Sequence, residues 1–141
     1  MAQLSEKRLF LLDMDGTIYL DEQLFDGVPE FLRYVRRVGG RYLFLTNNSG
    51  KTPRQLHEKL AWMGLQVDES HFYTSALATA RFISSQSPES SAYVIGGAGL
   101  IMALHDEGIT MNDVNPDYVV IGEARAYSLD TLTKATNLVL A

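Results

Sequence analysis

The 141-residue sequence contains no cysteine, so it can form neither a disulfide framework nor a cysteine-ligated metal site. This absence suits a reducing compartment. Basic residues are also few, since 12 lysines and arginines stand against 17 aspartates and glutamates and the formal net charge is -5. Because the basic residues form no cluster that overrides this balance, we expect no nucleic-acid partner.

Long apolar runs are missing as well. No stretch approaches the roughly 20 residues of a membrane-spanning helix, and the first eight residues lack the apolar segment of a secretory signal. We therefore expect a cytoplasmic protein without a membrane partner. The 46% hydrophobic and 21% charged content is typical of a globular protein with a substantial core.

An apolar run ends abruptly in two carboxylates. Residues 9–12 are large and apolar without alternation, which predicts a short strand of a parallel sheet, buried on both faces. Asp13 and Asp15 follow at its carboxyl end, where α/β sheets bind ligands. Side chains two apart on an extended segment point the same way, and a cation or a shared proton would relieve the repulsion between these carboxylates. Mg²⁺ is the first candidate because it needs only one or two carboxylates beside a substrate phosphate, although spacing alone also allows an ordinary acidic turn.

A second strand is predicted to end beside the first. Residues 28–38 have apolar side chains at helical spacing, and residues 42–45 form another buried strand. That strand ends in the polar residues Thr46, Asn47 and Asn48. Because a crossover helix returns the chain to the same side of a parallel sheet, Thr46 and Asn47 should face the two carboxylates. Residues 19–27, in between, are expected to form a loop in which Tyr19 serves only for packing.

The same strand-helix alternation returns in the second half of the chain. Strands are predicted over residues 92–95 and 118–121, with helices over 100–107 and from 129 onward. The polar, proline-containing stretch 84–91 is the best linker, so we expect one domain over 1–87 and a second over 88–141. Glycines at 96, 97 and 99 suggest a phosphate cradle, but their spacing favours a plain tight turn.

Asp13-Met14-Asp15-Gly16-Thr17, followed one strand later by Thr46-Asn47-Asn48-Ser49, closely resembles the haloacid dehalogenase superfamily of phosphohydrolases. Further segments resemble its NagD-like, nitrophenylphosphatase branch, which carries an α/β cap of type IIA: Tyr19-Leu20, Thr74-Ser75-Ala76, and residues 93–96 and 118–122. The resemblance implies an α/β fold with a parallel, Rossmann-like core sheet over 1–87 and the beginning of the cap over 88–141.

The resemblance also implies a Mg²⁺-dependent phosphatase that hydrolyses small phosphomonoesters through an aspartyl-phosphate. Asp13 would be the nucleophile, and Asp15 would protonate the leaving oxygen and then activate water. The Asp13 carboxylate and the Asp15 backbone carbonyl would hold Mg²⁺. Thr46 and the Asn47 amide would bind the phosphoryl oxygens, with Asn48 supporting them or contacting the substrate.

The sequence departs from the family pattern at its end. Family members continue to a lysine that neutralises the phosphoryl group and to an acidic motif that completes the metal site, and neither is present before residue 141. The resemblance therefore implies a truncated chain with an incomplete core. Two alternatives to an active phosphatase stay open: a weak or inactive fragment that only binds Mg²⁺ and phosphate, and a half that needs a second chain, such as a homodimer partner. Sugar phosphates, nucleoside monophosphates and aryl phosphates all stay open as the small phosphorylated substrate.

Overall fold

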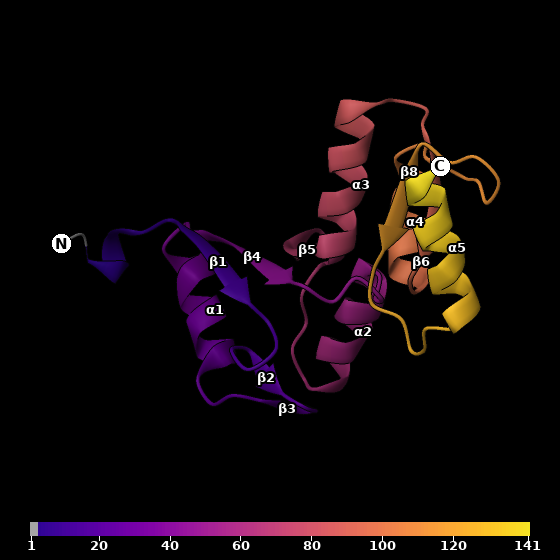
Figure 1. Cartoon of the computed structure of the whole chain (residues 1–141). Helices are drawn as coiled ribbons and strands as arrows, with labels where there is room; N and C mark the ends of the chain where they lie inside the picture. Colours follow the sequence, from indigo (N-terminus) through magenta and orange to yellow (C-terminus); the bar gives the residue numbers. More distant parts are fainter. Residues whose placement is uncertain (1–2) are drawn as a thin grey trace. The chain divides into compact units, whose positions relative to one another are not determined.

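The computed structural model describes residues 3–141 and divides them into two compact units (Figure 1). The first unit comprises the described residues up to Thr46 together with Pro53–Tyr73, and the second comprises Asn47–Thr52 and Thr74–Ala141. Each unit has its own cluster of buried apolar side chains. Strands pair in parallel in the main sheet of each unit and alternate with helices, which confirms the predicted α/β class.

The first unit is built on a sheet of strand order β1-β4-β5. Its strands are β1 (Leu9–Asp13), β4 (Arg41–Thr46) and β5 (Phe72–Thr74); its helices are α1 (Val28–Arg37) and α2 (Pro53–Trp62); and its 3-10 turns are η1 (Leu4–Glu6) and η2 (Glu69–His71). Strands β1 and β4 run parallel in a register that places Asp13 opposite Leu45. Asp13 and Thr46, the last residues of the two strands, therefore lie at one edge of this sheet.

Helix α1 forms the predicted crossover between β1 and β4. Its buried residues Val28, Leu32 and Val35 recur at helical spacing, and a proline occupies its first turn, where no backbone donor is lost. Gly39, with a φ of 70°, adopts the left-handed conformation that ends many helices. Local sequence signals thus fix both ends of this element.

The predicted double-sided burial of β1 is wrong for the part of the chain that the structure describes. Phe10 is buried, but Leu9 and Leu11 are 58% and 59% exposed. Successive side chains of a strand point to opposite faces, and only the face of Phe10 is covered, in part by an edge-on contact with Phe31 of α1. A continuous apolar run cannot by itself tell whether one face or both will be covered.

The loop expected over residues 19–27 is also wrong in part. It contains a small antiparallel hairpin of β2 (Tyr19–Leu20) and β3 (Gln23–Leu24). Asp21 lies in the turn between the two strands and has a φ of 54°. Strands of two residues are too short to show alternation of polar and apolar side chains, so the sequence carries no periodic signal for them.

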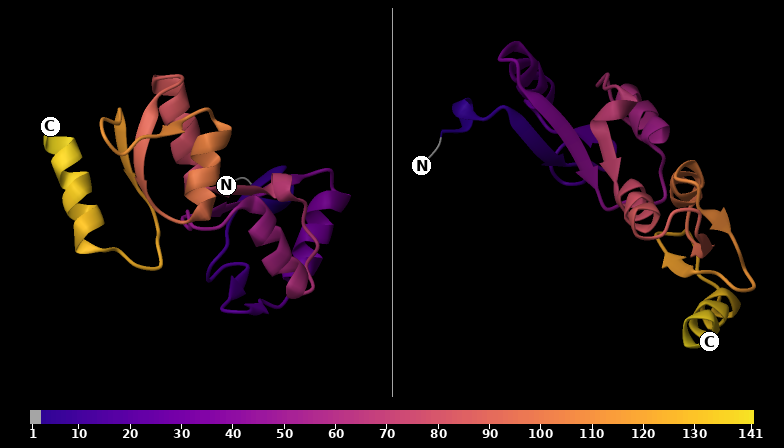
Figure 2. Two further views of the ribbon diagram at one scale, coloured as in Figure 1. Left: turned by 90° about the vertical axis from the view of Figure 1, so that its right-hand side faces the viewer. Right: turned by 90° about the horizontal axis from the view of Figure 1, so that it is seen from above.

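The second unit is built on a parallel sheet of strand order β7-β6-β8 (Figure 2). Its elements are α3 (Ser75–Gln86), β6 (Ser91–Ile95), α4 (Ala98–Asp106), β7 (Thr110–Met111), β8 (Tyr118–Ile121) and α5 (Leu129–Leu140). Helices α3 and α4 share a buried cluster with Ala92 of β6. Tyr93 points to the other face, where its hydroxyl donates to the carbonyl oxygen of Thr131 in α5 at 3.4 Å. The helices thus cover both faces of the sheet.

Packing places α3 in the second unit, so the division between units does not coincide with the linker expected around residue 87. The assignment of 1–87 to a core and 88–141 to a cap remains a prediction. The described residues include no helix of the length and apolar character needed to cross a membrane.

Candidate active site

The carboxylates and hydroxyl predicted to form the site lie at one edge of the first unit's sheet. Asp13 is the last residue of β1 and lies opposite Leu45, directly before Thr46, which ends β4. Asp13 and Asp15 are exposed, whereas Thr46 is buried. This edge therefore offers two accessible carboxylates beside a partly enclosed hydroxyl group.

A tight turn fixes the backbone around the carboxylates. The Met14 carbonyl oxygen accepts hydrogen bonds from the amides of Thr17 at 3.2 Å and Ile18 at 2.9 Å, while the Met14 side chain is fully buried. Gly16 has a φ of 77°, which L side chains rarely adopt, and its amide donates to the Tyr19 carbonyl oxygen at 2.8 Å. The turn is thus held from both ends.

Tyr19 is a residue of this region whose polar contact the sequence reasoning missed. Its side chain is 2% exposed, and its hydroxyl donates a hydrogen bond to the Asp15 carboxylate. Burial is the main reason that its pKa is raised, followed by the charge of Asp15 and, more weakly, that of Asp13. The Lys59 Nζ atom lies 3.8 Å from the centre of the tyrosine ring. The small sequence separation of Tyr19 from Asp15 across a glycine turn is the signal that could have indicated this contact.

Asn47 and Asn48 belong to the second unit, whereas Asp13, Asp15 and Thr46 belong to the first. Asn47 follows Thr46 directly in the chain and is exposed. The Asn48 Oδ1 atom accepts a hydrogen bond from the Gly50 amide at 2.9 Å. The Asn48 side chain is thus engaged in shaping its own loop.

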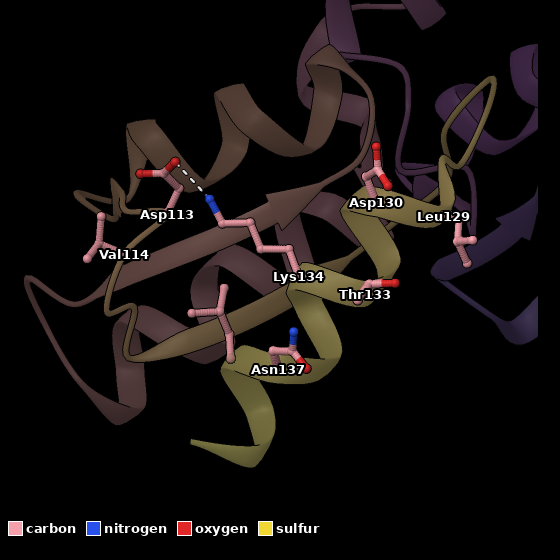
Figure 3. A pocket seen from close by; sticks show the side chains of 8 residues that line it. Asp113, Val114, Leu129, Asp130, Thr133, Lys134 and Asn137 are labelled. Carbon is pink, nitrogen blue, oxygen red and sulfur yellow. Dashed lines mark hydrogen bonds and ion pairs between the residues drawn. The ribbon is translucent and has the colours of Figure 1, made fainter.

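A cavity of about 380 Å³ lies next to Asn47 within the second unit. Its lining residues are Asn47, Ser49, Ser75, Thr79, Leu100, Val120, Ile121, Gly122, Glu123 and Tyr127. A wider hollow of about 540 Å³ lies between α5 and the segment after β7 (Figure 3). There the Lys134 Nζ atom is paired with Asp113 at 2.9 Å, so its charge is already compensated. Of these two cavities, only the first includes a residue predicted to bind phosphate.

The donor set at the β1 edge suits a hard cation. Among residues 3–141, no group of three or more histidines, aspartates or glutamates could hold a metal ion, so a cage made entirely of side chains is absent from them. Mg²⁺ needs only one or two carboxylates when water and substrate phosphate complete its shell. Asp13 and Asp15 therefore fit Mg²⁺ better than an ion that requires several protein ligands.

Comparison with known proteins gives a consistent result. Residues 10–110 match the haloacid dehalogenase-like hydrolase family. Dihydroxyacetone phosphatase of Corynebacterium glutamicum (strain R) is 42% identical over 131 residues, which make up 93% of this chain and 48% of that protein. Acid sugar phosphatase of Staphylococcus aureus (strain USA300) is 42% identical over 134 residues, or 94% of this chain and 52% of that protein.

The structure of NagD from E. coli K-12 is also similar, with a TM-score of 0.88 and 39% identity over 94% of this chain and 52% of that one. The chain thus spans about half the length of the curated relatives it matches. The matched family covers residues 10–110, which include both carboxylates and the polar end of β4. The chain belongs to the haloacid dehalogenase-like hydrolase family.

Proposed function

We propose that this chain carries the nucleophile region of a Mg²⁺-dependent phosphatase that hydrolyses small phosphomonoesters. The observation that carries the proposal is the pair of exposed carboxylates, Asp13 and Asp15, at the end of β1 beside the Thr46 end of β4. Two relatives named as phosphatases, each 42% identical, support it.

In the proposed reaction Asp13 attacks the phosphorus atom of the substrate. A bond forms between a carboxylate oxygen and phosphorus, the bond from phosphorus to the leaving oxygen breaks, and Asp15 gives that oxygen a proton. Asp15 then takes a proton from water as the water oxygen attacks phosphorus. The bond between Asp13 and phosphorus breaks, which releases inorganic phosphate and restores the Asp13 carboxylate and the protonated Asp15.

The phosphoryl group would be held by preorganised donors. The Thr46 hydroxyl and the Asn47 backbone amide are proposed to donate to its oxygens, where fixed donors stabilise developing charge most effectively. Mg²⁺, held by the Asp13 carboxylate and the Asp15 backbone carbonyl, would offset the repulsion between the nucleophile and the negatively charged substrate. Asn48, through its bond to the Gly50 amide, would keep the Asn47 segment in shape.

The proposed substrate is a small phosphorylated metabolite of the cytoplasm. The two curated relatives are named dihydroxyacetone phosphatase and acid sugar phosphatase, so three-carbon and sugar phosphates are the first candidates. A nucleic-acid partner is not proposed, because the net charge is -5.

One observation favours a second candidate, a chain that binds Mg²⁺ and phosphate but turns over only with a second chain, for example in a homodimer. Leu9 and Leu11 on β1 are both more than half exposed. Large apolar side chains grouped on a strand face are often covered by a partner.

The test is Mg²⁺-dependent release of phosphate from 4-nitrophenyl phosphate, dihydroxyacetone phosphate and a hexose phosphate. Asp13→Asn should lower turnover by about 10³-fold or more, because an amide cannot replace the nucleophile. Asp21→Asn is the matched control, since it removes an exposed carboxylate at a left-handed position that asparagine tolerates.

Turnover that survives Asp13→Asn would contradict the proposed nucleophile. If the unmodified chain binds Mg²⁺ and phosphate without turnover, the second candidate is favoured. Turnover that rises more steeply than protein concentration would identify the requirement for a second copy.

A further inference from the structure

The loop between β4 and α2, Asn47–Thr52, packs with the second unit although both flanking elements belong to the first. This β4–α2 loop carries Asn47 and Asn48, the residues proposed to act at the phosphoryl group. The backbone of this loop is therefore held by residues that lie far away in the sequence.

Hydrogen bonds join the β4–α2 loop to the rest of the second unit. The Ser49 Oγ atom accepts from the Glu123 amide at 2.7 Å, directly after β8, and Ser49 is only 6% exposed. The Asn47 carbonyl oxygen accepts from the Ser75 hydroxyl at 2.8 Å, at the start of α3. The Gly50 carbonyl oxygen accepts from the Gly99 amide at 3.1 Å, in the first turn of α4. The loop is thus bonded to three separate elements of the second unit.

The hydrogen bond from the Gly99 amide also satisfies a backbone donor in the first turn of α4. Amides in the first turn of a helix have no partner within the helix, and Gly97, the N-cap residue, has no side chain that could accept from them. The Gly50 carbonyl oxygen takes that role for Gly99. Loop and helix therefore satisfy each other's backbone groups.

Glycines let the backbones approach this closely. A Cβ atom at Gly99 would lie 2.6 Å from the Lys51 backbone, and one at Gly97 would lie 2.9 Å from the Gly50 Cα atom. A Cβ atom at Gly122 would lie 2.7 Å from the Ser49 Oγ atom. Gly97 has an ordinary φ of -79°, so the absence of a side chain, not backbone freedom, is what it contributes. Gly97 and Gly99, at the start of α4, thus let the β4–α2 loop pack against the helix.

We infer that Ser49, Gly97 and Gly99 are positioning residues that fix the backbone of Asn47 and Asn48 for binding a phosphoryl group. None of the three is assigned contact with the substrate. The inference rests on the proposed function for the ligand, but the ordering of the loop by these residues is a separate property. It makes the loop's geometry depend on the start of α4 and the end of β8.

Ser49→Ala tests the inference, with Ser90→Ala as the matched control. Ser90 is also a buried serine of the second unit, and its hydroxyl has no hydrogen-bond partner among the described residues. Amide hydrogen exchange and backbone NMR shifts of the full chain are measured, together with the affinity for inorganic phosphate in the presence of Mg²⁺. Gly99→Ala is a second variant that reaches the loop through α4.

Ser49→Ala should speed exchange of the Glu123 amide, shift the Asn47 and Asn48 resonances and weaken phosphate binding about tenfold. Resonances of residues 53–73 should stay in place, which shows that the chain is folded. Ser90→Ala should change none of these quantities. Gly99→Ala should shift the same loop resonances, because its methyl group displaces Lys51.

Unchanged Asn47 and Asn48 resonances in Ser49→Ala would overturn the inference. So would phosphate affinity that stays at its original value while those resonances move. If the unmodified chain binds no phosphate but Ser49→Ala still releases the loop, the ordering of the loop stands and the proposed function of the loop fails.

Discussion

Tyr19 lies where a single hydroxyl group influences a proposed catalytic carboxylate. Its pKa is raised, first by burial and then by Asp15 and Asp13, so the phenol stays protonated and remains a donor at neutral pH. A hydrogen bond from a buried, rigid ring restricts the orientations open to the Asp15 carboxylate. At the scale of the residue, Tyr19 is therefore expected to orient the proposed general acid.

Replacing Tyr19 by phenylalanine should harm some substrates more than others. An alkyl phosphate needs a proton on its leaving oxygen, whereas 4-nitrophenolate leaves without one. We expect Tyr19→Phe to lower kcat/KM for an alkyl phosphate by up to roughly tenfold more than for 4-nitrophenyl phosphate, because Asp15 loses the hydrogen bond that orients it and such a bond contributes about 0.5–1.5 kcal/mol. Steady-state kinetics with both substrates measure the difference.

Tyr42→Phe is the control for this experiment, since Tyr42 is also a buried tyrosine and its hydroxyl accepts from the Arg36 Nη2 atom at 2.6 Å. It should reduce both rates equally or not at all. Equal losses for the two substrates in Tyr19→Phe would show that the ring only packs.

At the scale of the element, one carboxylate joins the start of β6 to the start of β8. The Asp117 Oδ2 atom accepts from the Ser91 amide at 2.7 Å and from the Ser91 hydroxyl at 2.8 Å. These bonds, the amide first, hold the Asp117 pKa below its ordinary value of 3.8. The folded state then binds this proton less tightly than the unfolded state does. The stabilisation is therefore present above pH 3.8 and is lost as the pH falls through the lower folded value.

Asp117→Asn should make the second unit less stable at neutral pH and should flatten the acid limb of its stability curve. The amide oxygen can still accept one bond, but it carries no charge to be lost. Urea unfolding at several pH values between about 2 and 7 measures the effect. Asp26→Asn, which removes an exposed carboxylate from the first unit, should leave the acid limb of the second unit intact. If the stability of the Asp117→Asn variant fell with acid as steeply as that of the unmodified chain, the proposed role of Asp117 would be contradicted.

Elements of different length were predictable to different degrees. Helix α1 and the strands β4, β6 and β8 were predicted from the pattern of apolar residues and from the residues that bound each element. The structure confirms them. The two-residue strands β2, β3 and β7 were not expected. Such short pairings depend on the partner strand and the turn more than on their own residues.

At the scale of the whole molecule, residues 3–141 contain two separate buried clusters. Phe44 is fully buried in the first and Leu104 in the second. Phe44→Ala should cost about 3–5 kcal/mol and Leu104→Ala about 2–5 kcal/mol, because each leaves a cavity in a packed core. Hydrogen exchange with mass spectrometry should show lost protection mainly in the unit that contains the substitution.

Phe82→Ala is the matched control, since Phe82 is 61% exposed and its truncation should change stability by no more than about 0.5 kcal/mol. If Phe44→Ala and Leu104→Ala each removed protection evenly from both units, the two clusters would form one cooperative core.

The sequence by itself determined the parallel α/β class, the place of Asp13 and Asp15 at the end of a strand, and the family to which the chain belongs. These properties are encoded by local periodicity and by contiguous motifs. The catalytic and binding roles of these residues and of Thr46, Asn47 and Asn48 remain predictions. Only the tertiary structure decided that one face of β1 is covered and that Tyr19 bonds to Asp15. It alone also showed that Gly97 and Gly99, at the start of α4, contact the β4–α2 loop. The bond between Ser49 and Glu123 joins residues 74 positions apart, and no local pattern encodes such a contact.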